Sequence, residues 1–338
     1  MQVVVHRSVC YNLAVSNLLI GLVSALMATN QPAAVSNLVT KATGVSVAIP
    51  DANDPVEREY LKLLAEDDAA QKEVDKWIRD AEAFAAQGAG LPRATLTPKI
   101  EQRLEPVRKA YKDFLQRHPR HARARLAYGS FLNDIREEEE AVVQWEKARD
   151  LDPKNPAALN NLANHYGHRG PIKKAFEYYG KAIELSPDEP VYLQNLATTT
   201  YLFRKDAMEF YKINEQQVFD RALELYRKAL KLDQNNFPLA TDLAQSYYGI
   251  KPLRTEEALA AWNAALKIAN DNIEREGVYL HMARVELNSG LFDEARKHLD
   301  SVTNQMYAAL KTRLVRNLSE KENKAKGHVP APAVKSDR

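Results

Sequence analysis

The middle of the chain repeats its pattern of small, aromatic and apolar positions every 34 residues. In each period small residues stand where one helix would meet its neighbour, a large aromatic residue lies beside them, and a proline follows. Small residues at this spacing let two helices approach closely, and the proline stops the second helix. A helix pair of this kind buries its apolar face only against neighbouring pairs, so the pattern predicts a stack of helix hairpins. The recurring sets are Gly129, Ala163 and Ala197; Ala141 and Ala175; Trp145 and Tyr179; Ala148 and Ala182; Leu151 and Leu185; and Pro153 and Pro187.

Residues 156–189 show the pattern most completely. The first helix of this segment carries Leu159, Leu162, Ala163 and Tyr166 on one stripe, and the second carries Ala175, Tyr179 and Ala182. At nearly every position the segment resembles the tetratricopeptide repeat (TPR) family. The resemblance implies an all-α fold, a right-handed superhelical solenoid of TPR helix hairpins with an N-terminal and a C-terminal capping helix.

The domain boundaries follow from where this pattern begins, shifts and fades. We expect an N-terminal helical cap over 55–96, a solenoid over 97–302, a C-terminal capping helix over 303–323 and a disordered tail over 324–338. The repeat units are expected at about 97–121, 122–155, 156–189, 190–236 with an insertion at 201–217, 237–275 and 276–302.

The insertion contains aromatic residues that allow two interpretations. They could form an aromatic lip beside a binding groove, or they could pack the longer loop onto the next repeat, which we favour because four aromatic side chains in water favour aggregation. The four residues are Phe203, Phe210, Tyr211 and Phe219, accompanied by Arg204 and Lys205.

The N-terminal stretch has no charged residue between Arg7 and Lys41. We interpret 1–28 as a signal peptide or N-terminal anchor, followed by an extended linker over 29–54. Export, most simply to a bacterial periplasm, is the expected localisation, and an inner-membrane anchor is the alternative. The single cysteine, Cys10, lies in this segment, so a cleaved product would contain no disulfide.

Composition and motifs argue against several classes of function. Lysine plus arginine total 47 and aspartate plus glutamate total 45, so no net field attracts nucleic acid. Glycine-rich phosphate loops and the common hydrolase motifs are absent from the sequence. His165 and His168 are three residues apart but have no third ligand at a matching offset, which favours groove or surface histidines over a metal site. We expect no catalysis, cofactor or metal.

Recognition of a protein or peptide partner is the function that the resemblance implies. In TPR proteins the first helix of each pair lines the concave surface, and amides dominate the inward offsets of this chain. An asparagine side chain both donates and accepts, so it can pair with the main chain of a bound peptide, although such amides also cap turns. The candidate groove residues are Asn133, Asn160, Asn161, Asn164, His168, Gln194, Asn195, Tyr201, Asp242, Gln245, Tyr248 and Arg284.

We therefore expect a non-catalytic scaffold or assembly factor that holds a partner in a concave groove. A membrane-tethered accessory subunit of an envelope complex is one alternative. The TPR half of a glycosyltransferase-like system is another, since Asn161 and Asn195 occupy equivalent positions, similar to the asparagine ladder of protein O-GlcNAc transferases. The carboxylate clamp of other TPR proteins is disfavoured, because Leu126, Val191 and Asn195 stand where basic residues would be needed.

Overall fold

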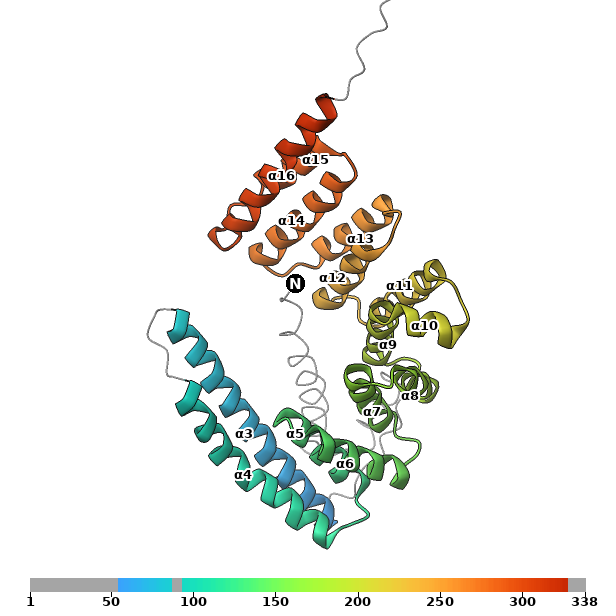
Figure 1. The fold of residues 1–338 in the computed structure, drawn as a ribbon. Coiled ribbons are helices and arrows are strands. Elements are labelled where there is room, and N and C mark those ends of the chain that lie inside the picture. The colour runs from blue at the N-terminus through green and yellow to red at the C-terminus, as the bar shows by residue number, and fades with distance from the viewer. Residues whose placement is uncertain (1–53, 87–92, 328–338) are drawn as a thin grey trace, which may run out of the picture. The chain divides into compact units, whose positions relative to one another are not determined.

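The structure, a computed structural model, describes residues 54–86 and 93–327 (Figure 1). The signal-peptide or anchor prediction and the linker up to residue 53 lie outside the described residues. Within them the chain forms helices and no strand, which confirms the expected all-α repeat fold. The chain divides into two compact units, residues 1–189 and 190–338, and each is described by itself.

The described part of unit 1 opens with a pair of long helices, α3 (Pro55–Ala86) and α4 (Arg93–Arg117), that lie side by side (Figure 1). The two run antiparallel, since Arg103 of α4 pairs with Glu66 and Glu73 of α3 while Arg117 pairs with Glu59. The buried stripe of α3 is Tyr60, Leu63, Ala70 and Val74, and that of α4 is Leu104, Val107, Tyr111, Phe114 and Leu115. We expected one capping element over 55–96, but α4 already begins at Arg93 and serves as the partner of α3.

Two helix hairpins follow in unit 1. They are α5 (Ala122–Asp134) with α6 (Glu138–Leu151), and α7 (Pro156–Arg169) with α8 (Ile172–Leu185). The small and aromatic residues of the 34-residue pattern lie at their contacts: Ala141, Trp145, Ala163, Ala175, Tyr179 and Ala182 are all at most 4% exposed. Close packing at the small positions is strict, because a Cβ atom on Gly129 would lie 2.5 Å from the indole of Trp145.

Unit 2 contains α9 (Pro190–Leu202), α10 (Arg204–Tyr211), α11 (Glu215–Leu232), α12 (Phe237–Ser246) and the 3-10 helix η1 (Tyr247–Gly249). It continues with α13 (Thr255–Lys267), α14 (Asn272–Asn288), α15 (Phe292–Asp300), η2 (Gln305–Tyr307) and α16 (Ala308–Lys326). The pairs α9 with α11, α12 with α13 and α14 with α15 pack as hairpins, and α16 covers α14 and α15.

Two expected boundaries shift in unit 2. Tyr201 and Leu202 belong to α9 and residues 215–217 belong to α11, so the inserted segment is 203–214 and includes the short helix α10. An Asn214–Gln217 capping box, in which each side chain bonds the other residue's main-chain N–H, starts α11 earlier than expected. At the other end, α16 runs to Lys326, three residues into the predicted tail, because neither glycine nor proline occurs before Gly327.

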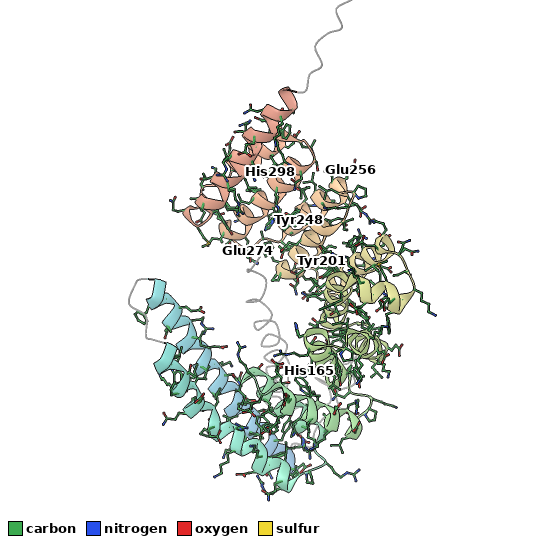
Figure 2. All side chains as sticks on the ribbon, viewed as in Figure 1. His165, Tyr201, Tyr248, Glu256, Glu274 and His298 are labelled. Carbon is green, nitrogen blue, oxygen red and sulfur yellow. The ribbon has the colours of Figure 1, made fainter. Side chains whose placement is uncertain are left out.

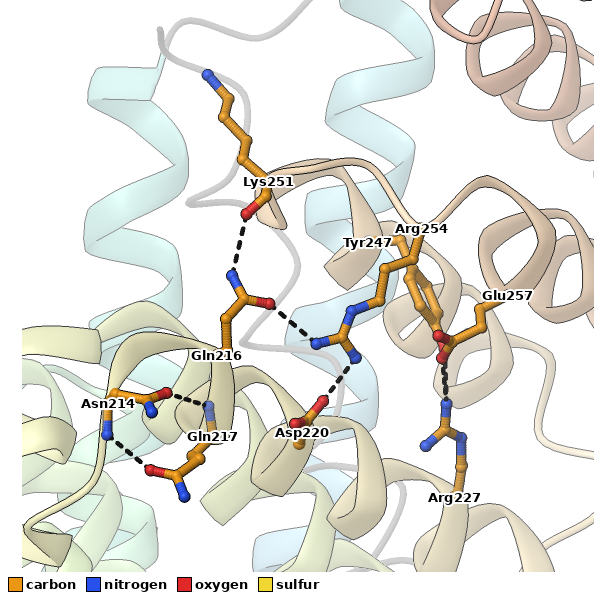
Figure 3. Close-up of polar contacts among 9 residues, drawn as sticks. All are labelled: Asn214, Gln216, Gln217, Asp220, Arg227, Tyr247, Lys251, Arg254 and Glu257. Carbon is orange, nitrogen blue, oxygen red and sulfur yellow. Dashed lines mark hydrogen bonds and ion pairs between the residues drawn. The ribbon is translucent and has the colours of Figure 1, made fainter.

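Polar side chains join α11 to the segment between α12 and α13 (Figure 3). Arg254 donates to Asp220 at 2.5 Å and to Gln216 at 3.0 Å, and Gln216 donates in turn to the carbonyl of Lys251 at 3.0 Å. A second bridge runs from Arg227 to the Tyr247 hydroxyl and to Glu257. These contacts fix the turn from one repeat to the next independently of the apolar core.

Three helices end with the same backbone geometry, and two of those ends carry a residue that fits it poorly. In each, the N–H of the second or third residue after the helix bonds the carbonyl five positions earlier: Glu137 to Leu132 (2.8 Å), Ile213 to Met208 (3.2 Å) and Leu291 to Glu286 (2.9 Å). The preceding residue takes a positive φ: 67° at Arg136, 55° at Lys212 and 78° at Gly290. Glycine adopts this conformation without strain, whereas residues with a Cβ do not.

Replacing Arg136 with glycine is therefore expected to stabilise unit 1 by about 0.5–1 kcal/mol, because relief of strain exceeds the extra entropy of the unfolded chain. Urea unfolding of the full chain measures the gain. As a matched comparison, Gly290→Ala should lower the stability of unit 2 by a similar amount. A destabilised Arg136→Gly variant would contradict this explanation of the turn.

Candidate functional site

The predicted groove residues of unit 1 lie on α5 and α7. Asn155 caps α7, its Oδ1 accepting from the N–H of Ala157 at 3.0 Å, and Pro156 starts the helix. Asn161 then lies between two successive first helices, where its Nδ2 donates to the Ser130 hydroxyl of α5 at 3.3 Å. Asn161 is therefore at the face expected for the groove and is partly exposed.

Other amides of α7 serve the packing of unit 1. The Tyr179 hydroxyl of α8 donates to Asn164 Oδ1 at 2.6 Å, so this amide joins the two helices of a hairpin. Asn160 is only 5% exposed and offers little surface to a partner. Asn133 is partly exposed and His168 is exposed.

The histidine pair of α7 carries no metal-site geometry. His165 is half-buried and its ring meets that of Tyr166 edge-on at 5.5 Å (Figure 2). Burial is the largest of the effects that lower the pKa of His165. In the described ranges, no group of three or more His, Cys, Asp or Glu side chains is arranged to hold a metal ion.

In unit 2 the predicted residues again lie between successive first helices. Gln194 of α9 donates to Asp242 of α12 at 3.0 Å and is 9% exposed. Asn195 is partly exposed on α9, and Gln245 is exposed on α12. Part of the predicted polar lining therefore holds neighbouring repeats together.

An aromatic stack connects Tyr248, Trp262 and His281. The rings of Trp262 and His281 are stacked at 4.4 Å with an interplanar angle of 4°, and the Tyr248 hydroxyl lies 3.0 Å from His281 Nδ1. Burial, followed by the nearby Arg284 cation, lowers the pKa of His281 to about 4, so this imidazole is neutral at pH 7. The Arg284 guanidinium lies 4.6 Å from the centre of the Tyr248 ring, which orients its charge.

Tyr201, the remaining predicted residue, supports η1. Its hydroxyl fills the space that a Cβ atom at Gly249 would need, so the glycine permits the close approach. Arg204 lies over the rings of both Tyr201 and Phe219, at 5.6 Å and 5.5 Å.

The aromatic residues of the inserted segment pack against the unit. Phe219 is 2% exposed, Phe203, Phe210 and Tyr211 are partly buried, and Arg221 lies 3.9 Å from the centre of the Tyr211 ring. These contacts agree with the packing interpretation that the sequence favoured and leave no free aromatic lip.

A groove between α14 and α16 is the feature that the sequence reasoning missed. It encloses about 620 Å³ and is lined by one stripe of each helix: Leu280, His281, Arg284, Leu287 and Asn288 from α14, and Leu310, Arg313, Leu314, Asn317, Glu320, Lys321 and Lys324 from α16. Arg284 is a predicted groove residue, whereas Arg313 is not among the predicted groove residues. The sequence of α16 carries no signal for this part of the groove, because the groove depends on where α16 docks.

Long-range polar contacts set the walls of this groove. Glu276 of α14 accepts the N–H groups of Thr303 (2.8 Å) and Asn304 (2.7 Å), which hold its pKa below the usual range and fix the segment that leads into α16. Farther along α16, the Lys321 ammonium donates to the carbonyl of Leu287 at 3.3 Å and to Asn288 Oδ1 at 3.0 Å. The last helix is therefore anchored to α14 at both ends.

Two parts of unit 1 match known repeat families. Residues 108–148 and residues 156–189 each match a family model described as tetratricopeptide repeat.

Across the described ranges, no helix combines the length and apolar content needed to cross a lipid bilayer.

Comparison with curated proteins gives a partial match. The Photosystem I assembly protein Ycf3 of Rippkaea orientalis (strain PCC 8801 / RF-1) is 30% identical over 102 residues, which are 29% of this chain and 59% of that protein. The chain thus matches less than two thirds of the length of this relative.

Two solved structures resemble the fold. The C-terminal part of a TPR repeat-containing protein from Cytophaga hutchinsonii has a TM-score of 0.50 at 13% identity, covering 78% of this chain and 99% of its own. PilW, described as a widely conserved type IV pilus biogenesis factor, has a TM-score of 0.50 at 12% identity, covering 72% and 97%. At these identities the likeness shows the fold alone.

Proposed function

The chain is a tetratricopeptide repeat protein, and from this we propose that it is a non-catalytic scaffold that holds an extended segment of a partner protein along the first-helix faces of its repeats. Each repeat stacks only on its neighbours, so the first helices form a continuous row of sites within a unit. The partner is a protein or peptide rather than a nucleic acid, because positive and negative charges balance over the chain.

The observation that carries the proposal is the groove between α14 and α16. It opens between two helices of one unit, has apolar side chains from both and contains amides and cations that can bond a peptide. A volume of about 620 Å³ is in the range of sites that bind ligands rather than of packing defects.

The named role of the curated relative supports an assembly function. Ycf3 is described as a photosystem I assembly protein, and the similarity spans 102 residues of this chain. We extend only the general role, bringing a partner into an assembly, to this protein. Export through residues 1–28 stays a prediction, with an inner-membrane anchor and an accessory role in an envelope complex as its alternative.

Site-directed photo-crosslinking in cells tests the proposal. A photoreactive residue at Asn317, inside the groove, should give a discrete partner adduct, whereas one at Asn263, on the outer helix α13, should not. Adducts of equal yield from both positions, or none from Asn317, would remove the support for a groove-binding scaffold.

The two amides at equivalent repeat positions give a quantitative expectation. Asn161→Ala in unit 1 and Asn195→Ala in unit 2, tested one at a time, should each weaken binding of a partner segment to that unit by about 1–3 kcal/mol, because main-chain groups of the bound segment lose their pairing. The melting temperature should change little, since both amides are partly exposed.

Asn263→Ala, on α13, is the matched control. Isothermal titration gives the affinities and circular dichroism the melting curves. Normal binding by both single variants together with much lower melting temperatures would assign these amides a structural role.

A further inference from the structure

The groove between α14 and α16 has an apolar floor. Leu280, Leu287 and Leu314 lie at its base and are 3%, 4% and 6% exposed, and Leu310 extends the floor toward the start of α16. These leucines belong to the core of unit 2, so the floor is rigid. Because Leu280, Leu287 and Leu314 are already almost fully buried, the apolar surface that a partner side chain could cover is mainly that of Leu310, which is partly exposed.

Cations dominate the rim. Arg284, Arg313, Lys321 and Lys324 line the groove, and Glu320 is the acidic residue among the lining side chains. Lys321 is engaged with the end of α14, as described above. Within the described residues, Arg284, Arg313 and Lys324 have no carboxylate within ion-pair distance.

The other carboxylates of α14 and α16 are occupied elsewhere. Glu322 pairs with Arg296 of α15 at 2.5 Å and Glu286 with His298 of α15 at 2.8 Å. Glu276 accepts from the segment before α16, and Glu274 accepts from Asn270, which precedes α14. Acidic residues thus bond toward α15 and the connecting segment, while basic residues gather at the groove. This separation of charge gives the groove a positive potential that the balanced total charge conceals.

Length and polar groups define the shape of the occupant. From Leu310 to Lys324 the groove follows α16 for about 21 Å, which matches an extended segment of about six residues. Asn317 lies midway along this wall, where its amide can pair with a main chain. Alternating side chains of an extended segment would point to the leucine floor and to the cationic rim.

We propose that the groove between α14 and α16 binds an extended acidic segment of the partner, with apolar side chains on the leucine floor and carboxylates on Arg284, Arg313 and Lys324. The inference rests on the proposed scaffold function and adds the chemistry of the bound segment. The proposed binding requires carboxylates on the side chains of the bound segment and does not require that segment to end in a free C-terminus. The chain's own residues 328–338 contain Lys335 and Arg338 against Asp337, so their charge does not complement the groove.

Fluorescence anisotropy with the full chain tests this inference. The probe is a labelled peptide of about six residues in which glutamate alternates with leucine, compared with the same peptide carrying glutamine for glutamate. The glutamate peptide should bind at least about tenfold more tightly, and added salt should weaken it, because exposed charge pairs are screened.

Charge-removing variants locate the binding. Arg284→Gln combined with Arg313→Gln should weaken the glutamate peptide at least about tenfold, and adding Lys324→Gln should weaken it further. Arg316→Gln removes the same charge from α16 outside the groove and should leave the affinity unchanged. Circular dichroism melting curves verify that the variants are folded.

Three results would overturn the inference: equal binding of both peptides, equal loss in Arg316→Gln, or a single-stranded oligonucleotide that binds more tightly with the same dependence on Arg284 and Arg313. The scaffold function is judged separately by the Asn317 crosslink. A partner adduct from Asn317 without binding of the glutamate peptide would leave the scaffold intact and refute only the acidic segment.

Discussion

Replacing Trp145 with alanine is expected to lower the free energy of unfolding of unit 1 by about 3–5 kcal/mol, the cost of removing a buried aromatic side chain from a core. Trp145 is 4% exposed and lies against Gly129 of the preceding helix. Hydrogen exchange of the amides in α5 to α8 measures the loss locally. A loss below about 1 kcal/mol would mean that the indole contributes no packing.

Gly129 provides a companion to this experiment. Gly129→Ala alone should destabilise unit 1 by about 1–3 kcal/mol, because the added methyl group would overlap the indole. In the Trp145→Ala background the same change should cost much less, since the overlap with the indole is gone and alanine favours helix by about 1 kcal/mol, while the close approach to the carbonyl oxygen of Ala141 at 3.1 Å stays. Additive effects of the two changes would show that the contact is not direct.

Asp67→Asn is expected to stabilise unit 1 at neutral pH by about 1–3 kcal/mol. Burial raises the pKa of Asp67 to about 6. The Tyr111 hydroxyl donates to the carboxylate at 2.6 Å, and this hydrogen bond lowers the pKa but offsets only part of the effect of burial. Asparagine keeps an oxygen that can accept from Tyr111, and it carries no charge to desolvate.

The sign of the pH dependence follows from the raised pKa of Asp67. The folded state holds the proton more tightly than the unfolded chain, whose carboxyl titrates near 3.8, so this contribution to stability declines as pH rises from about 4 to about 6. The variant should therefore equal the wild type near pH 4 and exceed it near pH 7 in urea unfolding. Tyr111→Phe should move the pKa of Asp67 higher still in a carboxyl NMR titration. If Asp67→Asn were more stable than the wild type by the same amount at pH 4 and at pH 7, the assignment of the raised pKa to Asp67 would be refuted.

The helix pairs could be predicted because the residues that determine them are local. Ala163, Ala175 and Tyr179 stand at offsets that only a repeated hairpin explains, and each is buried where the pattern placed it. Boundaries were less predictable where one element depends on a distant one. The apolar positions of the α3 sequence continue to Ile78 and Phe84, yet these two side chains are 37% and 52% exposed, because their burial depends on contacts with other elements.

The candidate site could be predicted only in part, because its residues have partners in other helices. Asn164 has the side chain of a ligand-binding residue, yet the hydroxyl of Tyr179 occupies its oxygen. The groove between α14 and α16 depends on where α16 docks, which Glu276 and Lys321 determine through residues 27 and 34 positions away. No local pattern reports contacts over such distances, so Arg313 alone could not be recognised as part of a groove.

The inserted segment with α10 also affects how unit 2 forms. Residues 203–214 separate the helices of the α9–α11 pair, whereas two residues, 170–171, separate those of the α7–α8 pair. Closing a twelve-residue connection in place of a two-residue one loses about 1.6 kcal/mol more chain entropy. Among the helix pairs of the described residues, α9–α11 therefore has the longest connection to close, and the contacts of α11 with α12 and the bridges from Arg227 and Arg254 hold α11 independently of α9.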